Sequence, residues 1–207
     1  MTDGSGLDGR TDPAPPTSLL RPSFQLQEPA RAGILLDRDG TIIVDYGYVG
    51  SPDQVELIDG AAEAIGRFND EGLPVVVVTN QGGVAHGYYG IDDVRRVHDR
   101  LSIELGRQGA HIDMFVFCPY HPYGVVDPFA RHSEDRKPRP GMAIAAARAL
   151  HLDLTTSWVI GDRPEDVGLA QTIGAAAVHI GPSLPTGLPS FLTLAEAADF
   201  VLQRIAA

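Results

Sequence analysis

The chain has 207 residues, 43% of them hydrophobic, one cysteine and a net charge of −11. This length and composition are those of a globular protein of one ordinary domain. No apolar run approaches the roughly 18 residues of a membrane span, and the N-terminus lacks the pattern of a signal peptide. The acidic balance argues against nucleic acid or an anionic membrane as a partner. A single cysteine excludes an internal disulfide and suits a cytoplasmic protein.

The first 30 residues differ in composition from the rest of the chain. They are rich in Gly, Pro, Ser, Thr and Asp, which predicts a disordered or loosely attached arm over residues 1–30. Residues 31–207 are predicted to form the folded domain, which we expect to be a monomer.

From residue 31 onward, short apolar runs alternate with segments of helical spacing. Strands are predicted at residues 32–37, 73–80, 112–119, 157–162 and 175–181, and helices at 60–72, 90–110, 139–152, 165–174 and 193–207. This alternation predicts βαβ units and therefore an α/β fold: a three-layer, Rossmann-like parallel sheet with helices on both faces. No gap between the elements is long enough for a large cap domain.

The first predicted strand runs directly into two carboxylates, Asp37 and Asp39, followed at once by Gly40. Side chains at positions i and i+2 of an extended chain point the same way. Two like charges held that close repel each other. We therefore expect a hard cation beside them, or a catalytic role for one of them.

Further candidate site residues stand at the ends of the second and fourth predicted strands and in the segment between the third and fourth strands. They are Thr79, Asn80 and Gln81 after the second strand, Gly161, Asp162 and Asp166 after the fourth, and Arg136, Lys137 and Arg139 in the segment between the third and fourth. Ligands of such sheets sit beyond the carboxyl ends of the strands, so these residues should meet at one edge. Carboxylates suit Mg²⁺, whereas hydroxyl and ammonium groups suit phosphoryl oxygens.

Four motifs in this order carry a resemblance: D-x-D-G-T, Thr after the second strand, Lys in the third segment and G-D-x-x-x-D. Together they resemble the haloacid dehalogenase superfamily of phosphohydrolases. Within it, the chain is similar to the heptose bisphosphate phosphatases and, next, to the histidinol-phosphatases. The phrases that carry this similarity span about residues 33–181: LDRDGTIIVDYGYV, IDGA, VVVVTNQGGVAHG, CPYHP and RKPRPGM.

The resemblance implies a phosphatase that works through an aspartyl-phosphate. Asp37 would be the nucleophile, and Asp39 the general acid and then the base that activates water. Mg²⁺ would be held by the Asp37 side chain, the Asp39 backbone carbonyl and Asp162. Thr79 and Lys137 would bind the phosphoryl oxygens as charge shifts in the transition state.

The resemblance also implies residues that contact the rest of the substrate. Arg136 is a planar donor suited to a second phosphate. The other expected contacts are Asp45, Tyr46, Gly47, Tyr48, Thr79, Asn80, Gln81, Gly82, Lys137 and Arg163.

Several of these residues have a structural alternative. Aspartates after strands often only cap the next helix, and for Asp166 we favour such a capping or buttressing role. Arg136 could be a solvated surface charge, and Tyr46 and Tyr48 could be packing residues.

The segment around residues 118–138 departs from the family pattern. The heptose phosphatases carry zinc there, in a pattern C-x-H followed by C-x-C. Here Cys118 remains, but Tyr120, Ser133 and Asp135 stand at the other three positions. A structural zinc needs four suitable ligands, so zinc is not expected. The alternative is a rearranged site made from Cys118, His121, His132 and Asp135.

The expected function is Mg²⁺-dependent hydrolysis of a small sugar phosphate, with D-glycero-D-manno-heptose 1,7-bisphosphate losing its 7-phosphate. One alternative is histidinol phosphate or another small sugar phosphate. An alternative of another class is an inactive homologue that binds a phosphosugar or a protein. Intact Asp37, Asp39, Lys137 and Asp162 argue against inactivity.

Overall fold

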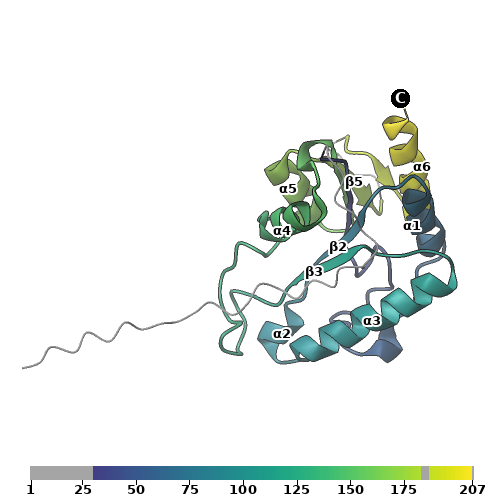
Figure 1. The fold of residues 1–207 in the computed structure, drawn as a ribbon. Helices are drawn as coiled ribbons and strands as arrows, with labels where there is room; N and C mark the ends of the chain where they lie inside the picture. The colour runs from purple at the N-terminus through teal and green to yellow at the C-terminus, as the bar shows by residue number, and fades with distance from the viewer. Residues whose placement is uncertain (1–29, 183–186, 207) are drawn as a thin grey trace, which may run out of the picture.

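A computed structural model describes residues 30–182 and 187–206, so the arm predicted for residues 1–30 lies, apart from Ala30, outside the described residues. Six parallel strands form one open sheet in the order β3-β2-β1-β4-β5-β6 (Figure 1). The strands are β1 (Ile34–Leu36), β2 (Val75–Asn80), β3 (Met114–Cys118), β4 (Trp158–Gly161), β5 (Ala176–Ile180) and β6 (Ser190–Phe191). The predicted parallel α/β fold is confirmed.

The described helices connect these strands. They are α1 (Ala61–Asp70), α2 (Gly83–His86), α3 (Ile91–Arg107), α4 (Gly141–Leu150), α5 (Pro164–Ile173) and α6 (Leu194–Ile205), with short 3₁₀ turns η1 (Pro52–Gln54) and η2 (Leu154–Thr156). All five predicted strands and all five predicted helices are present. The pattern did not predict β6 or α2, because two residues of strand and one turn of helix are too short to show a period.

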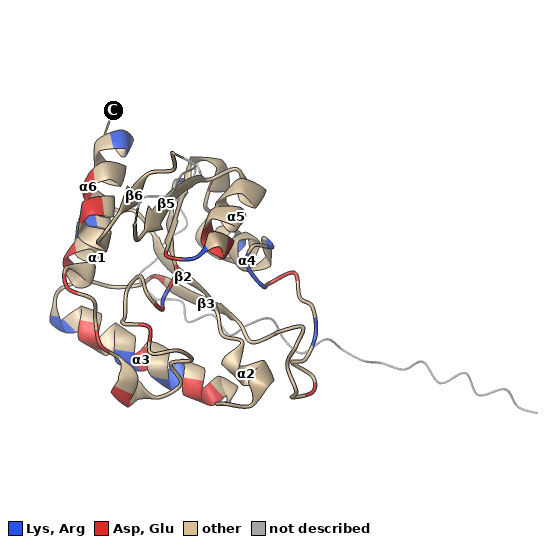
Figure 2. Cartoon of the chain, turned by 180° about the vertical axis from the view of Figure 1, so that it is seen from behind, with Lys and Arg blue, Asp and Glu red and all other residues tan. Residues whose placement is uncertain are grey.

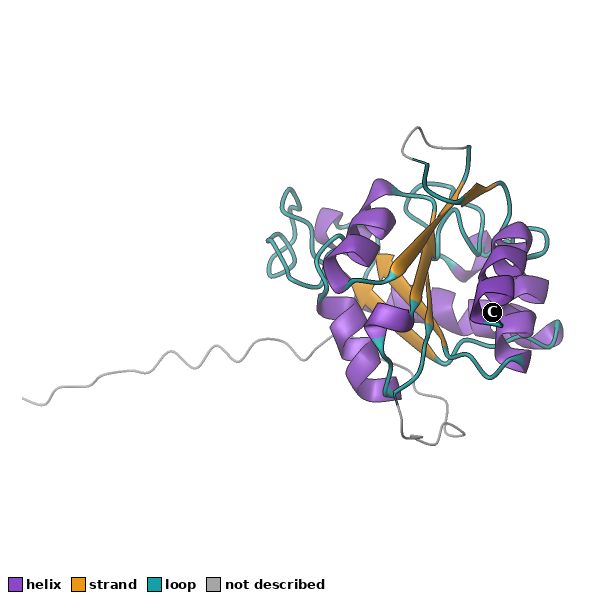
Figure 3. Cartoon of the chain, turned by 90° about the horizontal axis from the view of Figure 1, so that it is seen from above, coloured by secondary structure: helices purple, strands orange, loops and turns teal. Residues whose placement is uncertain are grey.

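Helices cover both faces of the sheet (Figure 3). Side chains alternate across each strand, so Ile34 and Leu36 of β1 pack with α1, α3 and α6, whereas Leu35 packs with α4 and α5. Because each face is buried, β1 and β2 read as continuous apolar runs rather than as alternating ones.

The strand order makes β1 the centre of the sheet. From β1 the chain crosses to β2 and β3 on one side and then returns to β4 on the other. Leu36 pairs with Val77 of β2 and with Ile160 of β4. The residues that follow β1 and β4 therefore emerge side by side at the point where the chain reverses its direction across the sheet, which is where such folds bind ligands.

The segments around this edge are short. Residues 37–60, between β1 and α1, hold η1 and a bridge between Ile43 and Leu57, with Ile42 and Ile43 fully buried.

Acidic and basic positions alternate along α3 (Figure 2), where ion pairs such as Arg107–Glu104 are formed within the helix. Among the described helices, none is both long and apolar enough to cross a bilayer.

Candidate active site

Asp37 is the first residue after the central strand, and it is almost completely buried. Its backbone N–H donates to the carbonyl of Ile160 in β4 (2.9 Å), which continues the sheet ladder. Its Oδ1 accepts the backbone N–H of Arg38 (2.7 Å) and lies 3.0 Å from Nζ of Lys137. Both of these contacts are made with Oδ1.

Lys137 lies between two buried carboxylates. Its Nζ is 3.0 Å from Asp37 and donates to Oδ1 of Asp166 at 2.6 Å. Burial by itself would lower the pKa of Lys137, but Asp37 and Asp166 raise it above its ordinary value, so the ammonium is charged at neutral pH. Asn80 at the end of β2 holds the backbone of Lys137 through two hydrogen bonds, which explains how this loop residue is held at the sheet edge.

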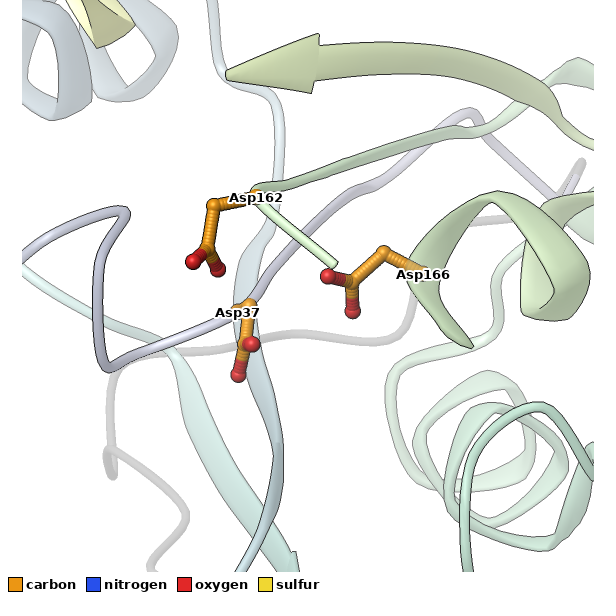
Figure 4. A group of neighbouring side chains, drawn as sticks. All are labelled: Asp37, Asp162 and Asp166. Atoms are coloured by element: carbon orange, nitrogen blue, oxygen red, sulfur yellow. The ribbon is translucent and has the colours of Figure 1, made fainter. Parts of the chain in front are cut away.

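A third carboxylate completes an acidic cluster. Ligand oxygens of Asp37, Asp162 and Asp166 lie within 4.8 Å of one another, and their side chains converge (Figure 4). Burial and the charge of Asp37 raise the pKa of Asp162 to about 6. Burial likewise raises the pKa of Asp166. The three carboxylates repel one another, and the positive charge of Lys137 offsets this repulsion only in part.

The cluster fits a hard divalent cation. Oδ1 of Asp162 is buried and has no hydrogen-bond partner among the described residues, a vacancy that a cation would satisfy. Gly40 has a positive φ of 80°, and a Cβ there would lie 2.4 Å from Oδ2 of Asp162, so only glycine lets the loop approach this carboxylate. Both oxygens of Asp166 already accept hydrogen bonds, from Lys137 and from the Arg163 backbone, which supports a buttressing role for it.

Asp39 occupies a different environment from Asp37. The buried guanidinium of Arg38 holds its carboxylate with contacts of 2.9 to 3.1 Å and also reaches the Val49 carbonyl. Nε2 of Gln81 donates to Oδ2 of Asp39 at 2.8 Å and to Oγ1 of Thr79 at 2.9 Å. Burial raises the pKa of Asp39, while Arg38 opposes that shift. Asp37 and Asp39, which are two residues apart in the sequence, thus have different partners.

These side chains surround one cavity of about 300 Å³. Of the predicted site residues, those that line it are Asp37, Asp39, Asp45, Gly47, Tyr48, Thr79, Asn80, Gln81, Arg136, Lys137 and Arg163. Tyr46, Gly82 and the predicted metal ligand Asp162 are not among them. The Tyr46 ring is half-exposed and its hydroxyl donates to Glu56.

Two lining residues, Tyr89 and Glu165, were not predicted. Glu165 stands in the first turn of α5, at one of the unspecified positions of the G-D-x-x-x-D motif, so its position could have indicated it. Tyr89 belongs to a turn between α2 and α3, and no sequence signal indicates its contact with the site.

Two arginines, Arg136 and Arg163, line the cavity. Nη2 of Arg163 lies 2.6 Å from Oδ2 of Asp45, and its Nε lies 3.4 Å from Asp162, so its charge is shared between two carboxylates. Arg136 donates to the carbonyl of Tyr120 at 3.3 Å. The Arg136 guanidinium is therefore the more available of the two for an anion in the cavity.

The loop expected to lack zinc has its own internal contacts. Burial raises the pKa of the Cys118 thiol to about 11, and its Sγ contacts the Tyr120 carbonyl. The hydroxyl of Ser133 donates a hydrogen bond to Oδ2 of Asp135, and Nδ1 of His121 accepts one from the backbone N–H of Tyr123. Among the described residues, the clusters that could hold a metal do not include Cys118, His121, His132 and Asp135. The absence of zinc stays a prediction.

Comparison with known proteins agrees with this geometry. The HAD-hydrolase-like family model matches residues 135–205. D-glycero-beta-D-manno-heptose-1,7-bisphosphate 7-phosphatase of Escherichia coli is 38% identical over 173 residues, which are 84% of this chain and 90% of that protein.

Two solved structures are also similar. A HAD-like phosphatase of Mesorhizobium loti has a TM-score of 0.80 and 34% identity, and the match covers 90% of this chain and 92% of that one. D,D-heptose 1,7-bisphosphate phosphatase of B. bronchiseptica, solved with magnesium and phosphate, has a TM-score of 0.73 and 30% identity over 84% of this chain and 99% of that one.

The parallel sheet, with paired carboxylates after its central strand, places the molecule in the class of HAD-like hydrolases. Within that class, the chain belongs to the family of D-glycero-beta-D-manno-heptose-1,7-bisphosphate 7-phosphatases.

The environment of Lys137 generates a stability prediction. Lys137→Met should lower the free energy of unfolding by about 3–5 kcal/mol in metal-free buffer, because buried Asp37 and Asp166 lose their cation. Urea unfolding followed by circular dichroism measures this loss. Arg139→Met is the matched control. Because Arg139 forms an exposed ion pair with Glu134, this substitution should lower the free energy of unfolding by less than about 1 kcal/mol. Equal losses in the two variants would contradict the prediction.

Proposed function

We propose that this protein is a Mg²⁺-dependent phosphatase that removes the 7-phosphate of D-glycero-D-manno-heptose 1,7-bisphosphate. The observation that carries the proposal is the buried Asp37 carboxylate, which faces the cavity with Lys137 3.0 Å from its Oδ1 and Asp39 two residues away. We assign the activity to residues 31–207 and leave the arm, residues 1–30, outside the phosphatase domain.

In the first half of the reaction, an Asp37 oxygen attacks phosphorus and forms an aspartyl-phosphate. The bond between phosphorus and the sugar oxygen breaks, and protonated Asp39 gives its proton to that oxygen, so the sugar leaves as an alcohol. The raised pKa of Asp39 favours a protonated acid, while the ammonium of Lys137 lies 3.0 Å from Oδ1 of the attacking Asp37.

In the second half, Asp39 is a carboxylate and takes a proton from water. The water oxygen attacks phosphorus, the bond to Asp37 breaks, and inorganic phosphate leaves. Asp39 ends protonated and Asp37 ends ionised, so both groups return to their starting states.

The phosphoryl oxygens need cationic and hydrogen-bonding partners as charge moves onto them. Lys137 and the hydroxyl of Thr79 line the cavity beside Asp37 and supply such partners. We assign a Mg²⁺ ion to the Asp37 and Asp162 side chains and the Asp39 carbonyl. When bound, it supplies positive charge that neutralises the carboxylates and the phosphoryl oxygens.

The sugar and its second phosphate would occupy the outer cavity. The residues assigned to this part are Asp45, Tyr46, Gly47, Tyr48, Asn80, Gln81, Gly82, Arg136 and Arg163. A bisphosphate suits the cavity because Arg136 reaches it without being committed to a carboxylate, unlike Arg163. The similar proteins are named as phosphatases of heptose 1,7-bisphosphate, which supports the proposal of this substrate.

Asp37→Asn tests the proposed function directly. We expect turnover to fall by roughly a thousand-fold or more, since a carboxamide is a poor nucleophile, while the nearly isosteric side chain leaves the protein folded. Phosphate release and thermal melting measure the two effects. Asp99→Asn, on the exposed side of α3, is the control and should retain full activity. Comparable turnover in Asp37→Asn would remove the proposed nucleophile.

Metal removal tests the proposed ion. EDTA should abolish activity, Mg²⁺ should restore it, and Ca²⁺ should restore it poorly because its looser coordination misplaces the nucleophile. Mg²⁺ should also raise the melting temperature by binding the folded state, with about 2.7 kcal/mol expected at a hundred times the Kd. Asp162→Asn should weaken both effects. Activity that persists in metal-free protein would exclude the ion from the mechanism.

Arg136→Ala tests the substrate. Its kcat/KM for a bisphosphate should fall about ten- to a hundred-fold more than for the matching monophosphate, since a charge-assisted contact contributes roughly 1.5–3 kcal/mol. Arg139→Ala, three residues along the same loop, is the control and should change neither value much. Losses of equal size on both substrates would show that Arg136 does not bind the second phosphate.

A further inference from the structure

Tyr89 lines the cavity and also contacts another lining residue, Gln81. Its hydroxyl donates to Oε1 of Gln81 at 2.8 Å. The other end of the same amide, Nε2, donates to Oδ2 of Asp39 at 2.8 Å and to Oγ1 of Thr79 at 2.9 Å. A continuous chain of hydrogen bonds thus runs from the turn between α2 and α3 to the proposed general acid.

An amide side chain has two orientations, and only one of them serves Asp39. The phenol of Tyr89 keeps its proton at neutral pH and is therefore a donor, which requires the oxygen of Gln81 to face it. That orientation turns the NH₂ group toward Asp39. Without the hydroxyl, nothing in this chain of bonds holds Oε1 of the buried Gln81 in place.

The ring of Tyr89 is held by two glycines. A Cβ on Gly50 would lie 2.2 Å from the ring, and a Cβ on Gly83 would lie 2.3 Å from it. The ring therefore occupies a slot between the loop after β1 and the start of α2, and any larger residue at either position would displace it. A ring confined in this way places its hydroxyl accurately.

Asp39 is held from two sides. Arg38 contacts both of its carboxylate oxygens, and Gln81 contacts Oδ2 from the side of β2. Arg38 makes three contacts with the carboxylate, and Gln81 adds a fourth at Oδ2 that further limits its rotation. The direction in which Asp39 presents its proton therefore depends on Gln81, and Gln81 depends on Tyr89.

We propose that Tyr89 is a positioning residue for proton transfer: through Gln81 it aims the carboxyl group of Asp39 at the oxygen that leaves. This inference rests on the proposed function. This role can be distinguished from mere support of the fold, because losing proton donation slows the reaction of some leaving groups and not of others. A sugar alcohol needs the proton as its bond to phosphorus breaks, whereas p-nitrophenolate leaves without it.

The test compares kcat/KM for a sugar phosphate and for p-nitrophenyl phosphate. This parameter reports the steps up to formation of the aspartyl-phosphate, in which Asp39 acts as the acid. Tyr89→Phe keeps the ring in its slot and removes only the hydroxyl. We expect kcat/KM to fall about ten-fold for the sugar phosphate and by less than about two-fold for p-nitrophenyl phosphate.

Three further variants control the comparison. Tyr88→Phe removes a neighbouring, exposed hydroxyl and should change neither value. Asp39→Asn should show the same preference in a stronger form. Gly50→Ala, which pushes on the Tyr89 ring, should reproduce the Tyr89→Phe pattern, whereas Gly106→Ala, where a Cβ meets open space, should not.

Equal losses on both substrates, or no loss on either, would overturn the inference. If Asp37→Asn still abolishes turnover in that case, the proposed phosphatase stands and only the role of Tyr89 fails. If Asp39→Asn shows no dependence on the leaving group, Asp39 is not the acid, and the inference fails with that step. If Asp37→Asn retains turnover, the proposed function itself fails.

Discussion

The cluster of buried carboxylates at the end of the central strand is the constraint on which the site depends. Asp37, Asp162 and Asp166 converge where β1 and β4 run side by side, and burial disfavours their charges. One ammonium group, that of Lys137, lies among them. Further positive charge offsets this excess of negative charge, which is why the same edge suits a divalent cation.

Asp37 and Asp39 are two residues apart in the sequence, but the rest of the site gives them different partners. Asp37 faces Lys137 and the acidic cluster, whereas Asp39 turns to Arg38, Gln81 and, through Gln81, to Tyr89. Burial raises the pKa of Asp39, whereas Asp37 has the ammonium of Lys137 beside it. That difference is what a reaction with one nucleophile and one proton donor requires.

The loops around the cavity have a second task, which is to hold cationic groups in place. Asn80 secures the backbone of Lys137, and the Tyr120 carbonyl orients Arg136. Asp45 forms an ion pair with Arg163, and both residues line the cavity. The proposed contacts to the second phosphate and the sugar thus depend on loops anchored to the sheet edge, which accounts for a defined cavity without a large cap domain.

The sequence by itself determined the α/β architecture and most of the site. Apolar runs separated by helical segments specify the strands, and carboxyl ends of parallel strands must meet, so Asp37, Thr79 and Asp162 could be placed together from order alone. Only the tertiary structure decided which partners they have. Tyr89 could not be predicted, because its contact depends on a slot between Gly50 and Gly83, residues brought together by folding. The hydrogen bond that Asp166 accepts from Lys137 has the same origin: a partner that is distant along the chain leaves no periodic signal in the sequence.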